Sequence, residues 1–311
     1  MYKVAVLMST YNGEQFLNEQ IDSILSQDEV QVKLFIRDDG STDQTVKIIK
    51  TYLDQYPQQI ELFLGKNIGY QKSFLHLINF PEVRDFDFIA FSDQDDIWFS
   101  KKLKHSCSQI NGKEPILLVS NARVFIEGHG DAGALYPYEH KLNNFLDTNF
   151  RPLYGMTFVF NKGLLNILVT NNIDHVAFLG HDNWIASVAI ACGKIFFLNE
   201  SLTRYRQHDA NASGFKGESS KISKMIHIIG KATELRKRIR KNSGYNSMIA
   251  KLILVELNPF LHLSERKLAE EIIRSRRNFF SRVHLFFSRK FTVGSLAQDL
   301  VLRVLLIRGR I

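Results

Sequence analysis

Cysteine is scarce in this sequence, which has only Cys107 and Cys192 among 311 residues. Both fall in apolar helical patterns and form neither a disulfide framework nor a CxxC metal site, which favours a reducing compartment. Long apolar runs are also missing. The run near the N-terminus, in MYKVAVLMSTYNG, is too short for a signal peptide. No uncharged stretch reaches the ~18 residues that a membrane-spanning helix needs, so we expect a cytoplasmic protein.

Two fingerprints of nucleotide-binding loops are absent as well. A Rossmann dinucleotide site needs G-x-G-x-x-G after the first strand, and a P-loop needs G-x-x-x-x-G-K-[ST]. The segment MSTYNGEQ, which follows the first apolar run, matches neither pattern. If this protein binds a nucleotide, the phosphates must be neutralised in another way.

What the chain does have is apolar residues, at 45% hydrophobic and 12% aromatic, enough to bury a large core. Its net charge of +8 is unevenly distributed. Residues 1–215 contain 19 Lys and Arg against 25 Asp and Glu, whereas residues 216–311 contain 21 against 7. The two parts therefore carry −6 and +14, and this break predicts two regions with different partners.

The first region, 1–215, alternates short apolar runs with amphipathic helical patterns, which is typical of an α/β fold. Helical spacing of apolar residues is found at 13–27, 41–56, 69–80 and 182–193. Strands are expected at 3–9, 32–40, 60–65, 85–93, 116–126, 156–162 and 195–206. We therefore predict an α/β sheet with flanking helices, followed by a basic α-helical C-terminal region.

Polar clusters follow three of these strands: STYNG at 9–13, DDGS at 38–41 and DQDD at 93–96. In an open α/β sheet, ligands bind at the carboxyl ends of the strands. The aspartates of the third cluster repel one another, and two explanations compete. They form a solvated turn that caps a helix beginning near Ile97, or they hold a divalent cation. Because the phosphates of a nucleotide would also need a counter-ion, we favour Mn²⁺ or Mg²⁺.

Five motifs, in order and spacing, resemble those of the family 2 glycosyltransferases, inverting enzymes of the GT-A fold. They are STYNGEQFLNEQIDSILSQ, IRDDGSTDQT, NIGYQKSF, FSDQDDIW and GHDNW. The resemblance covers about residues 3–210 and extends to the bacterial branch that includes rhamnosyltransferases of O-antigen and capsule assembly. It implies a GT-A fold, a Rossmann-like mixed sheet with flanking helices, for the first region.

The resemblance assigns roles to the first two clusters. Thr10, Tyr11 and Asn12 are expected to line the nucleoside of the donor, with Tyr11 stacked on the base. Asp39 is expected to hydrogen-bond the base or the ribose, and Asp38 is its neighbour in the same role.

In the third cluster, the resemblance makes Asp93 and Asp95 a D-x-D motif. Asp95 is expected to be a direct metal ligand, and Asp93 to contact the metal, a metal-bound water or the ribose. Asp96 takes either role or caps the helix expected near Ile97. His208 is expected to reach the metal or the phosphates.

Four further residues are expected to contact the donor. Arg204 and Arg206 suit the oxygens of a diphosphate, although a surface strand with alternating arginines gives the same pattern. Gly69 is expected to let the donor approach the backbone, and Lys72 to contact the base or a phosphate.

The resemblance makes Asp182 the catalytic base, a carboxylate that takes the proton of the acceptor hydroxyl as this attacks the anomeric carbon. The alternative is that Asp182 caps a helix over residues 184–191, and the two roles are compatible. His181 stands where the family more often has Glu or Asp, and an indirect or acceptor-side contact is expected for it.

The basic tail allows three interpretations. Charge alone permits nucleic-acid binding, but no recognised motif accompanies it, so we expect no nucleic-acid partner. A helical clamp or a contact between copies in an oligomer is the second. We favour an anchor on an anionic membrane surface, in which the apolar faces at 222–229 and 279–287 enter the interface. The protein would then be peripheral on the inner face of the cell membrane.

Together these patterns predict a metal-dependent glycosyltransferase that moves a sugar, rhamnose from dTDP-rhamnose, onto a lipid-linked saccharide in O-antigen or capsule synthesis. A UDP-hexose would use the same motifs.

Two alternative functions belong to other classes of protein. A sugar-nucleotide pyrophosphorylase is expected to have a basic, Gly-rich loop after the first strand, which STYNGEQ is not. A non-catalytic scaffold is expected to lack Asp95 or Asp182, and both are present.

Overall fold

The computed structural model describes residues 1–136, 141–208, 244–293 and 296–309. The domain boundary expected near residue 215 and the apolar face expected at 222–229 lie outside the described residues.

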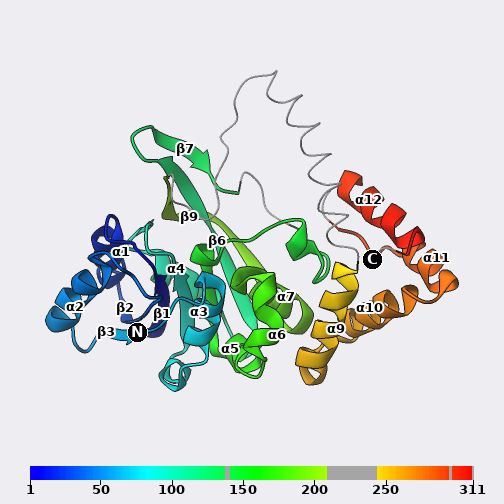
Figure 1. Cartoon of the computed structure of the whole chain (residues 1–311), viewed down its shortest axis with the longest axis horizontal. Coiled ribbons are helices and arrows are strands. Elements are labelled where there is room, and N and C mark those ends of the chain that lie inside the picture. The colour runs from blue at the N-terminus through cyan, green and yellow to red at the C-terminus, as the bar shows by residue number, and fades with distance from the viewer. Residues whose placement is uncertain (137–140, 209–243, 294–295, 310–311) are drawn as a thin grey trace.

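The described strands join into one mixed sheet, which Figure 1 shows running through the first region. They are β1 (Tyr2–Thr10), β2 (Val30–Asp38), β3 (Ile60–Leu64), β4 (Phe88–Ser92), β5 (Ile97–Trp98), β6 (Ile116–Ile126), β7 (Gly130–Ala134), β8 (Phe158–Asn161) and β9 (Lys194–Gln207). The order is β3-β2-β1-β4-β8-β6-β9-β5, and β7 pairs with β6. The first four strands in this order are parallel, β8 is antiparallel to both its neighbours, and β6 and β9 are parallel again.

Helices cover both faces of the sheet. Successive side chains of β1 point to opposite faces of the sheet, and both faces are apolar. Val4, Val6 and Met8 belong to one buried cluster, and Ala5 and Leu7 belong to the other. On the first face pack α1 (Leu17–Leu25), α2 (Thr45–Gln55) and α4 (Lys102–Gln109). On the second pack α3 (Tyr70–Ile78), α5 (Lys162–Leu168) and α7 (His181–Cys192), with the short α6 (Ile173–Val176) near them. The predicted α/β sheet with flanking helices is confirmed.

The prediction of a helix that begins near Ile97 is wrong. Ile97 and Trp98 form β5, which pairs antiparallel with β9, and α4 begins only at Lys102. The N–H of Trp98 donates to the hydroxyl of Ser23 at 3.0 Å, so this backbone is held by the sheet and by α1 rather than by a helical turn. Tertiary partners thus decide the conformation of this short segment.

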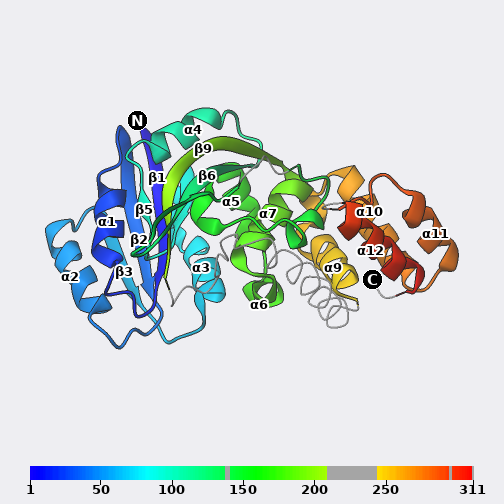
Figure 2. The same cartoon turned by 90° about the horizontal axis from the view of Figure 1, so that it is seen from above.

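The described part of the C-terminal region is helical, as predicted. It contains α9 (Tyr245–Leu257), α10 (Leu263–Ser275), α11 (Phe279–Phe287) and α12 (Leu296–Ile307). Ile253 and Leu268 belong to the same buried cluster as Trp184 of α7, so the hydrophobic core continues from the sheet into these helices. Figures 1 and 2 place them at the opposite end of the molecule from β1–β3. None of the described helices is long and apolar enough to cross a membrane.

Glu265 of α10 is buried where this region meets the first one, and its carboxylate accepts the N–H of Phe145 at 3.3 Å. Burial raises the pKa of Glu265 from 4.5 to about 7, although the Phe145 N–H partly opposes the shift. Between these two values the unfolded chain binds fewer protons than the folded one, so stability falls as the pH rises. The destabilisation is absent below pH 4.5 and complete above about pH 7.

Glu265→Gln keeps an oxygen acceptor for Phe145 and never ionises. The variant should gain thermal stability over the native protein between about pH 5 and about pH 8, by roughly 2–4 °C for each kcal/mol of relieved desolvation. Calorimetric melting at three pH values measures this. The control is Glu270→Gln on the exposed side of α10. A difference in Tm that stays constant across the pH range would contradict the assignment.

Candidate functional site

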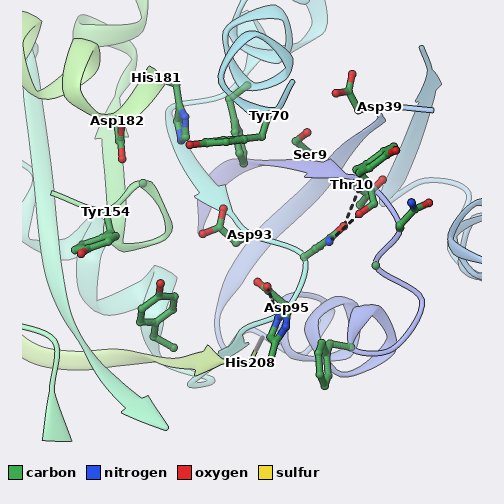
Figure 3. A pocket seen from close by; sticks show the side chains of 18 of the residues that line it. Ser9, Thr10, Asp39, Tyr70, Asp93, Asp95, Tyr154, His181, Asp182 and His208 are labelled. Atoms are coloured by element: carbon green, nitrogen blue, oxygen red, sulfur yellow. Dashed lines mark hydrogen bonds and ion pairs between the residues drawn. The ribbon is translucent and has the colours of Figure 1, made fainter. Parts of the chain in front are cut away.

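A cavity of about 530 Å³ opens at the carboxyl ends of β1 and β4. Segments far apart in the sequence meet there, as Figure 3 shows: the ends of β1, β2 and β4, the starts of α3 and α7, and the residue after β9. Its lining is Ser9, Thr10, Tyr11, Asn12, Gly13, Gln15, Phe16, Asp39, Tyr70, Phe74, Asp93, Gln94, Asp95, Tyr154, Gly155, His181, Asp182, Tyr205 and His208.

The turn after β1 is held from β2. Thr10 donates its hydroxyl to Asp38 at 3.0 Å, and the other carboxylate oxygen of Asp38 accepts the N–H groups of Gly40 and Ser41. Asp38 is therefore buried behind the cavity and shapes both turns. Tyr11 presents a half-exposed ring to the cavity.

Gln94, which sequence analysis did not single out, fixes the same turn from β4. Its side-chain amide accepts the N–H of Tyr11 at 2.9 Å and donates to the carbonyl of Tyr11 at 3.1 Å. Gly13 leaves room for it, because a Cβ at that position would lie 2.4 Å from Oε1 of Gln94. Nothing in the spacing of the D-Q-D segment marks this role for the glutamine.

Asp39 lines the cavity and connects β2 to the start of α3. Its carboxylate pairs with Arg37 and accepts the N–H groups of Ile68 at 2.9 Å and Gly69 at 2.8 Å. Gly69 has φ of 83°, a conformation that favours glycine, and precedes α3. Lys72 lies outside the cavity lining and pairs with Asp174 at 2.8 Å.

Two of the three aspartates in the acidic cluster line the cavity, and the third does not. Asp93 and Asp95 line the cavity, and Oδ2 of Asp95 lies 2.9 Å from Nε2 of His208. Burial, together with the charges of Asp95 and Asp182, raises the pKa of Asp93 to about 7. Asp96 points away from the lining, is fully buried and accepts the N–H of Arg206 at 3.0 Å.

A buried lysine, Lys102, lies behind the acidic cluster. Lys102 of α4 is fully buried, donates to the carbonyl of Met156 at 2.5 Å and to the hydroxyl of Thr203 at 2.7 Å, and its charge lowers the pKa of Asp93 and Asp96. Burial lowers the pKa of Lys102 itself to about 7. Nothing in the local sequence around Lys102 marks this lysine as buried.

Arg204 and Arg206 lie outside the cavity lining. The guanidinium of Arg206 is sandwiched between the rings of Phe16, at 4.3 Å, and Phe125, at 4.8 Å. Its nitrogens also reach Glu19 and Glu127, both at 2.6 Å, and the carbonyl of Asp95 at 2.8 Å. Arg204 stacks on Phe125 at 4.6 Å. Arg206 thus holds the backbone that carries Asp95.

Asp182 lines the cavity from the first turn of α7. The residue that precedes this helix is Gly180, and Oδ1 of Asp182 accepts the N–H of the adjacent Asn183 at 2.8 Å. Figure 3 shows Asp182 facing the same space as Asp93. Burial first, and then the charges of Asp182 and Asp93, raise the pKa of Tyr70, which the sequence did not single out.

The carboxylates of Asp93 and Asp95 fit Mn²⁺ or Mg²⁺ in their chemistry, since these cations prefer oxygen ligands, and His208 lies beside Asp95. The repulsion that raises the pKa of Asp93 is also the kind that a bound cation relieves. Within the described residues, no three His, Cys, Asp or Glu side chains are already gathered around one metal position.

Comparison with known proteins identifies relatives. The family model "Glycosyl transferase family 2" matches residues 5–168. The dTDP-rhamnosyl transferase RfbG of Shigella flexneri is 29% identical over 262 residues, covering 79% of this chain and 83% of that protein. The putative glycosyltransferase EpsE of Bacillus subtilis is 33% identical over 133 residues, covering 42% of this chain and 47% of that protein.

Among solved structures, S. aureus TarS 1–349 has a TM-score of 0.52 at 17% identity, over 99% of this chain and 81% of that chain. Its complex with UDP-GlcNAc also gives 0.52, over 92% and 74%. These similarities confirm the predicted GT-A-like fold. Since the family model spans more than half of the chain and RfbG is similar over most of it, this protein is a member of glycosyl transferase family 2.

Proposed function

We propose that this glycosyltransferase is metal-dependent and inverting, and that it moves a sugar from a nucleoside diphosphate to a hydroxyl of a saccharide. One observation carries the proposal. Asp93 and Asp95 after β4, Asp182 at the start of α7 and His208 after β9 line a single cavity, although they are widely separated in the chain. A cation site for a diphosphate and a carboxylate base for an attacking hydroxyl are the two elements that such a transfer needs.

The donor's nucleoside is assigned to the part of the cavity beside β1 and β2. Tyr11 offers a ring face for the base, and Asn12 and Thr10 lie in the same turn. Asp39 is the carboxylate that lines this part, while Asp38 and Gly69 act indirectly by holding the backbone.

Asp93, Asp95 and His208 would hold the metal. When bound, Mn²⁺ or Mg²⁺ supplies Lewis-acid stabilisation of the departing diphosphate. Asp182 takes the proton of the acceptor hydroxyl as the hydroxyl attacks the anomeric carbon from the side opposite the diphosphate. This single displacement inverts the anomeric configuration. Arg206 keeps Asp95 in place through its backbone carbonyl.

For the donor, similarity to RfbG, named a dTDP-rhamnosyl transferase, favours dTDP-rhamnose. A UDP-hexose is the alternative, because TarS, similar in fold, has been solved with UDP-GlcNAc. We propose a lipid-linked saccharide of O-antigen or capsule synthesis as the acceptor.

We also propose that the C-terminal helices bind the inner face of the cell membrane. On α11, Phe280 is 81% exposed and Phe287 is 76% exposed. The exposed basic residues Arg276, Arg277 and Arg289 flank the same helix. Exposed aromatic rings beside basic side chains suit the interface of an anionic bilayer, where each basic residue contributes about 1 kcal/mol.

Asp95→Ala should abolish metal-dependent nucleotide binding, because it removes the carboxylate assigned to the cation. Calorimetric titration with dTDP and with UDP, each with and without Mn²⁺, measures this. Asp54→Ala, on the exposed surface of α2, is the control. Unchanged affinity of the Asp95 variant in the presence of Mn²⁺ would remove Asp95 as a ligand.

Asp182→Asn should keep donor binding and reduce turnover by roughly 10²-fold or more, the usual contribution of a general base. Asn retains an oxygen for the N–H of Asn183, so the start of α7 should be preserved. Sugar transfer from dTDP-rhamnose and from UDP-GlcNAc is followed with Asp54→Asn as the control. Turnover close to that of the native enzyme would show that another group is the base.

Phe280→Glu combined with Phe287→Glu should weaken binding to anionic vesicles at least tenfold, because two apolar anchors are lost and two negative charges are added. Co-sedimentation with vesicles of anionic and of neutral lipid measures the effect. Phe178→Glu, at an exposed phenylalanine outside α11, is the matched control. Equal sedimentation of all three proteins would rule out α11 as the membrane-binding surface.

A further inference from the structure

His181 is an imidazole in an almost entirely aromatic environment. It is 4% exposed, stacks on Phe74 at a centroid distance of 4.3 Å, and meets the edges of Phe91 at 5.4 Å and Tyr70 at 6.2 Å. Neither ring nitrogen has a hydrogen-bond partner within the described residues. A phenylalanine would fill this position without leaving polar atoms unpaired.

Unpaired buried polar atoms are uncommon, because each loses its hydrogen bonds to water and gains none in return. The rest of the cavity follows that rule closely, as the amide of Gln94 and the carboxylate of Asp39 show. The exception at His181 is placed directly before Asp182, and both residues line the cavity. An unpaired polar group at this position points to a ligand that completes it.

The surroundings of Nε2 support this. A Cβ at position 155 would lie only 2.7 Å from Nε2 of His181, and Gly155 itself lines the cavity. Gly155 therefore lies against the ring nitrogen at the cavity wall without a side chain of its own. Tyr154, the neighbouring lining residue, adds a flat ring of the kind on which sugars stack.

We propose that His181 is a specificity-determining residue that hydrogen-bonds a pyranose hydroxyl held beside Asp182. A neutral imidazole has one donor and one acceptor, the same pair that a sugar hydroxyl offers. Burial lowers the pKa of His181, in keeping with this neutral form, although the charge of Asp182 opposes the shift. The proposal rests on the proposed function, since it presupposes that the cavity binds a sugar. The hydroxyl belongs to the donor sugar or to the acceptor saccharide.

Two substitutions separate this role from simple packing. His181→Phe keeps the aromatic ring and removes both nitrogens, whereas His181→Gln keeps a donor and an acceptor and loses the ring. If His181 binds a hydroxyl, His181→Phe should lower kcat/KM by about tenfold to a hundredfold, with Tm unchanged or raised. His181→Gln should then recover part of the activity. If His181 only packs against its neighbours, the two variants rank the other way: His181→Phe should be as active as the native protein, and His181→Gln should be less active. Gly155→Ala places a Cβ 2.7 Å from Nε2, so the ring or this backbone must shift, and the variant should also lower kcat/KM.

The source of the hydroxyl is found with three measurements on the full-length protein, with His129→Phe as the control at an exposed histidine. These are the affinity for dTDP-rhamnose and UDP-GlcNAc relative to free dTDP and UDP, donor hydrolysis without acceptor, and transfer of labelled sugar to membranes of the native host. A loss in all three, with nucleotide affinity intact, identifies a donor hydroxyl. A loss in transfer alone identifies an acceptor hydroxyl.

Native-like values for His181→Phe in all three measurements would overturn the proposal and leave the proposed function standing. If the native protein itself binds neither nucleotide, the proposed function fails first and the sugar subsite fails with it.

Discussion

Mutual repulsion of carboxylates after β4 is the constraint on which the arrangement of this site depends. Asp93, Asp95 and Asp96 occupy three of four consecutive positions, and Asp182 of α7 faces the same space as Asp93. Burial raises the pKa of Asp93 and Asp96, and the charges of the neighbouring aspartates raise it further. Carboxylates held together in this way need hydrogen-bond donors and positive charge nearby, and this fold supplies several of them.

Most of that compensation comes from β9 and α4. β9 is parallel to β6 along most of its length, and this pairing carries its end back to the acidic cluster. Arg206 then donates its backbone N–H to Asp96 and its side chain to the carbonyl of Asp95, while His208 faces the carboxylate of Asp95. Lys102 supplies a buried charge from behind. Each of these groups acts on the position or ionisation of an aspartate that lines the cavity or supports its wall.

The strand-end clusters were predictable because short apolar runs locate the buried strands, and parallel strands bring their carboxyl ends to one edge. The same logic failed at Ile97, where a two-residue strand depends on partners in α1 and β9. Arg206 was expected at a diphosphate, but its ring contacts and ion pairs with Glu19 and Glu127 place it behind the cavity. Local sequence gives the residue type, while distant segments decide the direction of the side chain.

The sequence by itself determined the α/β class, the order of the motifs and the aspartates that line the cavity, because apolar runs, helical spacing and family motifs are local properties of the chain. Only the tertiary structure decided which residues complete the site. Gln94, Tyr70 and Lys102 have ordinary local contexts, and their roles arise from contacts with segments that are distant in the sequence. The unpaired nitrogens of His181 are the clearest case, since an absent hydrogen bond is visible only when every neighbour within the described structure is in place.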